Sequence, residues 1–452
     1  MLTASAKLAV TTWSRFMDEN SPLYQMRRGM ARMPRLVALV ALIAFIGVPA
    51  HSVAQDAPAP ASGLRWRNRP SIQLGPHVRL DIHARLAGDW RAVDDSGLDV
   101  DTARWRFRRA GVEGEIADHL QFEIERDLPA DGRWRDVFVN WRTYRAFQVQ
   151  AGRFKIPFGR EQLTSIARVD FAERALTSSS IAPARATGLM AHGRFWGRGL
   201  TYEVGIFDGD GDNGELRGGS PFGVQPEWTG PSFAGRATGV PLRRFSRALR
   251  TLRVGAAGGT VGIPEGLNSF RGESVLGTGE FFPPVYVNGR RTRTGLEVTY
   301  TPGPVGLAAE WMRAREQRKL QGIGDVDLSD VITTGWYAAA TWLVTGEDKS
   351  GFNAPRRALF DGGMGAIEIA ARYEALTVVS ANRDGPAFSN PRAEHILGNG
   401  DRVWTLGVNW FPNRWTRVTA NAIRERFDDP VRTPRPGVTR FWSGILRLQV
   451  AF

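Results

Sequence analysis

Alternation of apolar and polar residues with a period of two dominates the chain after residue 75. In the segment 77–90 almost every second residue is apolar, and most of the intervening residues are charged. A β-strand directs successive side chains to opposite faces, so this segment is predicted as a strand with one apolar and one charged face. The same alternation recurs at 120–125, 200–206, 293–300, 367–374 and 442–452, with turn residues between such segments, as at 208–214, 302–304 and 411–413.

Two architectures produce this pattern: a soluble β-sandwich and an outer-membrane barrel with an apolar outside and a wet lumen. Individual segments run for nine or more residues, as a tilted membrane strand requires. The chain also ends on a strand whose last residue is Phe452. Aromatic residues lie near strand ends, as interfacial girdles require, namely Trp90, Trp311, Trp336, Trp404, Trp410, Trp415 and Trp442. The prediction is an all-β, transmembrane, antiparallel barrel over 76–452, with about 16 strands and an aqueous channel.

The N-terminal 54 residues carry a separate signal. Four arginines between 27 and 35 precede an apolar run over 36–48, which is too short for a membrane span. Small residues follow at 52–54, as at a signal-peptide cleavage site. Residues 1–54 are therefore predicted as an N-terminal extension and a secretory signal peptide, with Met30 or Met33 as alternative starts. Residues 55–75 are predicted as a flexible lead-in.

Composition narrows the function. The chain has 452 residues, no cysteine, a net charge of +13 and only four lysines among its 59 basic residues. The missing cysteines exclude a disulfide scaffold, a thiolate zinc site and a cysteine nucleophile. Almost the whole positive charge is therefore carried by arginine, which stays protonated at any relevant pH and binds oxyanions bidentately.

Strand parity places a surplus of arginine on the lumen face. A row of cations in a narrow pore supplies several weak sites in series, which anion conduction requires. The alternative is that these arginines pair with lumen carboxylates such as Glu123 and Glu125. The arginines predicted to line an anion pathway are Arg79, Arg85, Arg104, Arg106, Arg108, Arg291, Arg293, Arg372, Arg417 and Arg447. A bulge near Ala110 would let Arg108 and Arg109 exchange faces.

One stretch resembles the phosphate-selective porin O and P family. It runs from Gly152 through Lys155 and Gly159 to Ser165 and continues at 170–174. Further similar patches occur in family order at 182–188, 205–209, 341–347, 368–373 and 407–413. The residues that carry the most distinctive part of the resemblance are Gly152, Phe154, Lys155, Pro157, Phe158 and Gly159.

The resemblance implies a 16-stranded, homotrimeric outer-membrane barrel with a long loop after the strand that ends near Phe158, folded inward as a constriction. It places Arg160, Arg168, Arg174 and Arg185 in that loop or at its flanks. Family members with true phosphate selectivity are expected to carry several loop lysines in the pore. Here Lys155 is the only lysine between 55 and 318. The resemblance therefore supports an anion preference more strongly than phosphate selectivity.

Other functions have weaker support in the sequence. The acidic segment 208–215 lacks the sixth-position glycine of a calcium loop and is interpreted as a hairpin loop. The histidines show no metal spacing, and no metal, cofactor or catalytic residue is predicted. A barrel hydrolase needs a lipid-facing Ser–His pair, whereas His77, His83 and His119 are predicted to face inward. A closed structural or adhesive barrel does not explain the inward charge, and dispersed arginines do not form a nucleic-acid patch.

The sequence thus predicts an exported, passive, water-filled porin of a Gram-negative-type outer membrane, selective for anions through a lumen arginine ladder. Phosphate or other oxyanions are the expected solutes, with pyrophosphate or chloride also open. The alternative is a general, non-specific anion porin.

Overall fold

The computed structural model describes residues 62–66, 68–95, 97–98, 100, 102–117, 119–129, 132–211, 230–246, 249–268, 270 and 272–452. The predicted signal segment 1–54 and residues 212–215 of the acidic loop lie outside these residues. No helix in the described part of the chain is long and apolar enough to cross a membrane.

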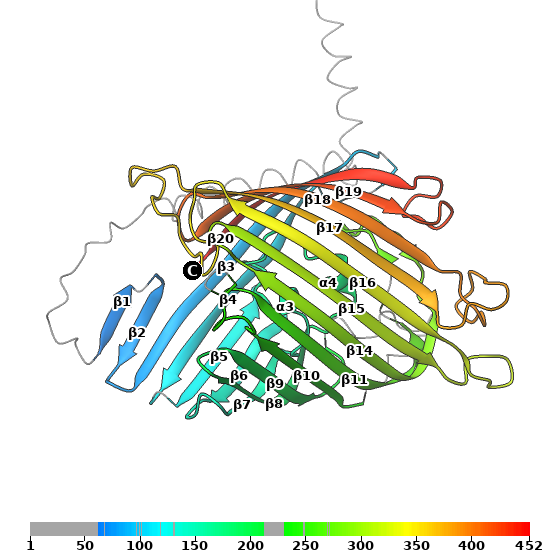
Figure 1. Cartoon of the computed structure of the whole chain (residues 1–452), viewed down its shortest axis with the longest axis horizontal. Helices are drawn as coiled ribbons and strands as arrows, with labels where there is room; N and C mark the ends of the chain where they lie inside the picture. The colour runs from blue at the N-terminus through cyan, green and yellow to red at the C-terminus, as the bar shows by residue number, and fades with distance from the viewer. Residues whose placement is uncertain are drawn as a thin grey trace, which may run out of the picture.

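Sixteen antiparallel strands of the described chain form a closed barrel (Figure 1), which confirms the predicted fold. The last strand closes the wall against the first, with Ala451 opposite Arg85 and Ser443 opposite Val93. The strands of the wall are β3 (Val78–Val93), β4 (Ala103–Ile116), β5 (Leu120–Asp127), β6 (Trp134–Trp141), β7 (Gln148–Lys155), β8 (Arg185–Phe195), β9 (Leu200–Phe207), β10 (Ser232–Gly239), β11 (Arg253–Leu267), β14 (Tyr286–Tyr300), β15 (Val305–Arg318), β16 (Leu328–Leu343), β17 (Ala366–Ser380), β18 (Asn399–Phe411), β19 (Thr416–Phe427) and β20 (Arg440–Ala451).

A short hairpin precedes the wall and changes the expectation for 55–75. Strands β1 (Gly63–Trp66) and β2 (Pro70–Leu74) pair with each other, and β2 pairs with the start of β3, with Ile72 opposite Leu80. Trp66 packs edge-on against Trp415, with ring centroids 6.4 Å apart. Part of the segment predicted as a flexible lead-in is therefore held at the barrel wall, because backbone pairing and an aromatic contact fix it.

The two ends of the barrel differ. Short connections at 117–119, 196–199, 301–304 and 412–415, together with longer ones at 240–252 and 344–365, lie at the end where β3 begins and β20 finishes, which we call the turn end. Long connections at 156–184, 268–285, 381–398 and 428–439 lie at the opposite end, the loop end. In outer-membrane barrels the short turns are periplasmic and the longer loops are extracellular.

Wall strands are not equally long. β14 to β17 have 14 to 16 residues, whereas β5, β6, β7, β9 and β10 have 8 each. The prediction of nine or more residues per strand is therefore wrong for this sector. Regular pairing of β6 with β7 covers only Val137 to Trp141.

Alternation on the long strands follows the predicted pattern. On β14, Arg291 and Arg293 are buried on the lumen side while Leu296 and Val298 are exposed on the outside. Trp311 and Trp336, on neighbouring strands, lie directly opposite each other on the outer face. The outside is therefore the apolar face and the lumen the charged one.

Candidate functional site

The long loop 156–184 folds into the barrel between β7 and β8, as the family resemblance implied. It contains the short helices α3 (Arg160–Leu163) and α4 (Leu176–Ser180), visible inside the wall in Figure 1. The family stretch positions its start. Phe158 is completely buried, and Gly159 has a φ of +71°, where a Cβ would come within 2.5 Å of the Met312 side chain. Glycine is favoured at this turn because of its positive backbone angle.

The rest of the family stretch is also structural. Gly152 has a φ of +125°, and a Cβ there would lie 2.3 Å from the backbone oxygen of Val137. Phe154 packs edge-on against Phe138 and Phe207. Pro157 is buried beside Phe158 at the inward turn. These residues direct the chain into the lumen.

Lys155 holds the end of α3. Its Nζ donates hydrogen bonds to the backbone oxygens of Gln162, Leu163 and Thr164 at 2.8, 3.0 and 2.9 Å. A lysine ammonium has three donors, and all three are used here. Lys155, the only lysine between 55 and 318, therefore stabilises the loop.

The start of α3 is held by the wall. The Glu310 carboxylate on β15 accepts the backbone N–H groups of Arg160 and Glu161 at 2.5 and 2.9 Å. Tyr337 on β16 donates its hydroxyl to the same carboxylate at 2.7 Å. A carboxylate at a helix N-terminus satisfies unpaired N–H groups. Both ends of α3 are thus tied by a side chain.

Many lumen side chains bind the backbone of this loop. Arg293 donates to the Ile181 oxygen at 2.8 Å, and Arg372 donates to the Glu173 oxygen at 3.1 Å. The same pattern continues around the wall, where Asn409 donates to Asp170, Arg417 to Val169 and Gln449 to Ala167, and Asn421 accepts from Ala172. The side chains that hold the loop backbone come from β14, β15, β17, β18, β19 and β20.

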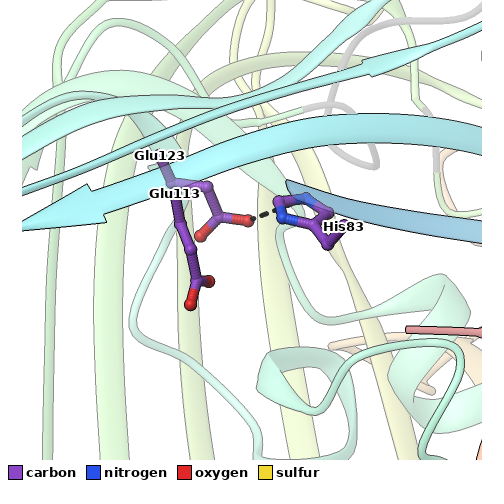
Figure 2. A group of neighbouring side chains, drawn as sticks. All are labelled: His83, Glu113 and Glu123. Atoms are coloured by element: carbon purple, nitrogen blue, oxygen red, sulfur yellow. Dashed lines mark ion pairs between the residues drawn. The ribbon is translucent and has the colours of Figure 1, made fainter. Parts of the chain in front are cut away.

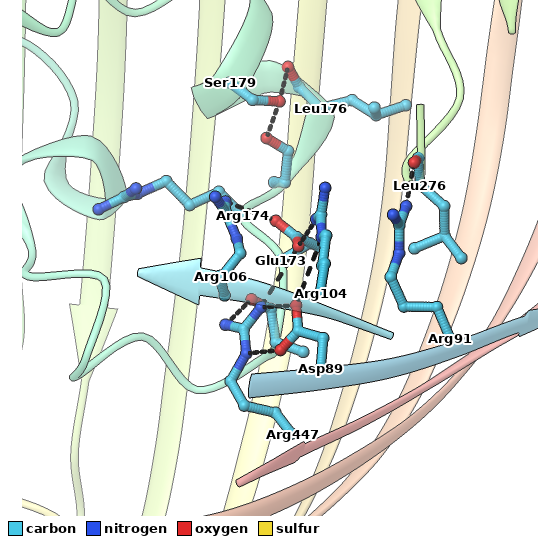
Figure 3. A network of polar contacts seen from close by, with 12 residues as sticks. Asp89, Arg91, Arg104, Arg106, Glu173, Arg174, Leu176, Ser179, Leu276 and Arg447 are labelled. Atoms are coloured by element: carbon cyan, nitrogen blue, oxygen red, sulfur yellow. Dashed lines mark hydrogen bonds and ion pairs between the residues drawn. The ribbon is translucent and has the colours of Figure 1, made fainter. Parts of the chain in front are cut away.

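Glu173 is the centre of a further network that holds the loop (Figure 3). Arg104 and Arg106 of β4 donate to its carboxylate at 3.0 and 2.8 Å, and Arg447 of β20 approaches it at 3.3 Å. Arg447 also binds both carboxylate oxygens of Asp89 on β3, at 2.6 and 2.8 Å. The network joins the loop to the seam where the last strand meets the first.

The charge of Glu173 is fixed by its neighbours. Burial alone would raise the pKa of this loop carboxyl, but the neighbouring arginines outweigh it, Arg106 most of all, and lower the pKa to about 2. The carboxylate is therefore ionised at neutral pH. It cancels part of the positive charge that the sequence assigned to the channel.

Five of the ten predicted lumen arginines form a buried group. Arg291, Arg372 and Arg447 are fully buried, and Arg293 and Arg417 are nearly so. Arg291 and Arg293 both pair with Asp210 at the end of β9. These five arginines support the loops rather than face open water.

The second group lines an open space. A cavity of about 910 Å³ lies between the inserted loop and the wall formed by β3 to β10. Its cationic lining residues are Arg85, Arg104, Arg106, Arg109, Arg135, Lys155, Arg174, Arg185 and Arg236, and its carboxylates are Glu123, Asp136, Glu173, Glu203 and Glu273. Nine cations against five carboxylates leave the lining positive. We call this space the channel cavity.

Arg109, not Arg108, faces the channel cavity. The register between β3 and β4 shifts where Ala87 pairs with Phe107 and Gly88 pairs with Trp105, so Arg106 is the extra residue of a bulge. The placement of Arg108 on the lumen side is therefore wrong, and its guanidinium lies 5.8 Å from the Trp105 ring on the outer face. The bulge lies nearer the loop end than the sequence suggested.

The remaining predicted arginines have mixed positions. Arg79 lies on the lumen side, 3.1 Å from Asp81, outside the channel cavity lining. Arg174 lines the cavity, whereas Arg160 is half-buried in α3 and Arg168 is exposed. Arg185 is not a loop residue. It begins β8 and pairs with Asp136 at 2.6 Å.

A second loop, 268–285, narrows the lumen and was not predicted. It carries the small strands β12 (Gly272–Glu273) and β13 (Glu280–Phe282). The Val275 backbone N–H donates to Glu425 at 2.6 Å, and Arg91 donates to the Leu276 oxygen (Figure 3). Phe281 and Phe282 are completely buried in an apolar cluster shared with the first loop. Adjacent phenylalanines within a long interstrand loop were the available sequence signal.

One group of described side chains is close enough to hold a metal. His83, Glu113 and Glu123 have donor atoms within 4.8 Å of one another on the lumen side of β3 to β5 (Figure 2). Arg69, however, pairs with Glu113, and His83 lies 3.4 Å from Glu125, which pairs with Arg85. Because arginines already pair with Glu113 and with the neighbouring Glu125, we assign the group to an ion-pair network.

Comparison with known proteins supports a channel. The model of the family described as phosphate-selective porin O and P matches residues 80–452. Among solved structures, OmpT of Vibrio cholerae aligns with a TM-score of 0.51 at 13% identity, covering 83% of this chain and 98% of that one. Its trimer form aligns with a TM-score of 0.50 at 15% identity, covering 83% and 100%. The outer membrane channel DcaP of Acinetobacter baumannii aligns with a TM-score of 0.51 at 11% identity, covering 83% and 98%.

No protein of curated function matches the sequence. The closed barrel with loops folded into a wet lumen defines an outer-membrane porin, a protein of the outer membrane of Gram-negative bacteria. The chain belongs to the phosphate-selective porin O and P family, which confirms the resemblance found in the sequence.

Proposed function

We propose that this porin is a passive channel that prefers anions, with phosphate and other inorganic oxyanions among its solutes. The observation that carries the proposal is the lining of the channel cavity, where nine cationic side chains outnumber five carboxylates. A low-dielectric wall strengthens the attraction of an anion to such a lining. Several partly neutralised arginines also give weak sites in series, so that a bound anion can leave again.

A general anion channel without phosphate specificity is the second candidate. Arg104 and Arg106 already bind Glu173, and the three donors of Lys155 are occupied by backbone oxygens. A phosphate ion would have to compete with these partners for bidentate contact. Chloride and pyrophosphate therefore remain solutes to be compared with phosphate.

Reversal potential across a planar bilayer, under a KCl gradient, tests the anion preference. An anion-selective reversal supports the proposal, and a cation-selective one contradicts it. Titration with phosphate then separates the two candidates, because only an oxyanion site gives a chloride current that low phosphate blocks.

Neutralising channel arginines should weaken the selectivity. The double variant Arg106→Gln/Arg109→Gln removes two of the nine cations that line the channel cavity. A unit charge about 4 Å from an anion contributes about 1 kcal/mol in water, or roughly a fivefold change in local anion concentration. We expect the chloride-to-potassium permeability ratio to fall several-fold, measured by reversal potential.

Arg108→Gln is the matched control for this variant. Arg108 lies between the two substituted residues in sequence but points to the outer face. Its substitution should leave the permeability ratio unchanged. Equal ratios in the double variant and the control would exclude the channel cavity as the anion pathway.

We further propose that the porin is a homotrimer exported through a signal peptide at 1–54. The 8-residue strands β5, β6, β7, β9 and β10 are shorter than the 9–11 residues that a tilted strand needs to cross the bilayer. Contact with neighbouring copies of the chain in a trimer would shield this sector of short strands from lipid. The similar OmpT of Vibrio cholerae is described in a trimer form, which supports the same assembly here.

A further inference from the structure

Four arginines form a cluster on the outer face of β18, β19 and β20, near the loop end. Arg402 lies on β18, Arg424 and Arg426 on β19, and Arg440 on β20, and all four are exposed. They occupy the same parity as the apolar residues of these strands, so they point away from the lumen. The channel therefore makes no use of them.

The register brings three of these charges side by side. Arg402 is directly opposite Arg426, and Arg426 is directly opposite Arg440. Side chains at opposite positions of an antiparallel pair have Cβ atoms about 5 Å apart, and like charges placed there destabilise the sheet. Arg402 has Asp428 as a partner at 3.2 Å. Among the described residues, no carboxylate forms an ion pair with Arg424, Arg426 or Arg440.

The depth of this arginine row in the membrane follows from the neighbouring tryptophans. Trp404 follows Arg402 by two residues toward the turn end, and Trp442 follows Arg440 in the same way. Arg424 lies over the Trp442 ring at 5.6 Å. Tryptophans on the outer face of a barrel lie at the lipid headgroup level. The arginine row therefore lies at or just beyond the headgroups of the outward-facing leaflet.

We propose that Arg402, Arg426 and Arg440 bind the phosphate groups of the anionic lipid in that leaflet, the lipid A portion of lipopolysaccharide. Guanidinium groups form bidentate hydrogen bonds with phosphate oxygens, and a phosphate shared by neighbouring strands relieves the repulsion within the row. Acyl chains then pack against the apolar wall below. The inference rests on the outer-membrane location and outward loop end, and is independent of which ion the channel conducts.

Native mass spectrometry of the detergent-solubilised porin, titrated with bisphosphorylated lipid A, tests this site. The variant Arg402→Gln/Arg426→Gln/Arg440→Gln should bind lipid A at least about tenfold more weakly than the wild type. Each basic residue near an anionic lipid surface contributes favourably to the binding free energy, and the variant lacks three of them. Lipid A without phosphate groups should bind the wild type and the variant equally. Inorganic phosphate alone should displace little lipid, because it lacks acyl chains.

The control variant is Arg198→Gln/Arg244→Gln/Arg357→Gln, which removes three exposed arginines from turn-end connections. It should retain wild-type affinity for lipid A. Unchanged single-channel conductance shows that both variants are folded. Conductance is measured separately from ion selectivity, so this control does not depend on which ion the channel prefers. Equal lipid A affinity in both triple variants overturns the proposal. The proposal is also overturned if the Arg402→Gln/Arg426→Gln/Arg440→Gln variant keeps its affinity for lipid A but no longer self-associates. In that case the arginine row contacts other copies of the chain rather than lipid.

Discussion

Substitution of Arg447 by methionine is expected to lower the free energy of unfolding of the barrel by about 3–5 kcal/mol, because it leaves a buried charge without its partner. Arg447 has no exposed surface and holds both oxygens of Asp89 across the seam between β20 and β3. It also donates to the Ala172 oxygen of the inserted loop. One side chain thus supports both barrel closure and loop attachment.

The midpoint of denaturant-induced unfolding measures this loss. The double variant Arg447→Met/Asp89→Asn removes both charges and should recover part of the stability, so that the double-mutant cycle isolates their coupling. Arg108→Met makes the same replacement on the outer face and should shift the midpoint little. A midpoint of Arg447→Met equal to that of Arg108→Met would show that the seam does not depend on this pair.

Replacing Lys155 by methionine is expected to loosen the inserted loop and give larger, noisier single-channel currents. The Nζ group makes three hydrogen bonds at the end of α3, and bonds to a charged group contribute about 1.5–3 kcal/mol each. Without them, the last carbonyl groups of α3 lose their partners. The loop then occupies a wider range of positions in the channel.

Conductance in KCl, combined with phosphate titration, separates this structural role from solute binding. Lys319→Met is the matched control, because Lys319 is exposed in a loop-end connection. Unchanged conductance with weaker phosphate block in Lys155→Met would instead make Lys155 a ligand for the passing ion.

The sequence was sufficient for the barrel because its signal is local. Alternation on segments such as 293–300 and 442–452 determines which side chains face the lumen, and the structure follows it on β14 and β20. The position of the bulge in β4 was not predictable, because a bulge depends on pairing with Ala87 and Gly88 of another strand. A shift of one residue was enough to exchange Arg108 with Arg109.

The site was only partly predictable, for a different physical reason. Parity shows that Arg291 and Arg447 point inward, but it does not show whether water or a loop occupies the lumen at that height. The loop 268–285 enters the lumen through the burial of Phe281 and Phe282, which is a tertiary effect. The sequence therefore predicted one ladder of inward arginines. In the structure, the arginines in one half of the lumen hold the inserted loops, and those in the other half line the channel cavity.

The barrel wall holds the constriction loop by the loop's backbone, so the fold of the loop does not depend on the side chains that determine its selectivity. The wall side chains bind main-chain atoms of the loop, as Arg293 does at Ile181 and Arg417 does at Val169. Main-chain atoms are present whatever the side chain, so substitutions at the loop positions that face the channel leave these anchors in place. Ser165 and Ser179 are two such positions. Point mutations there give this architecture a route to new solutes without a new scaffold, which makes the constriction an evolvable part of a stable barrel.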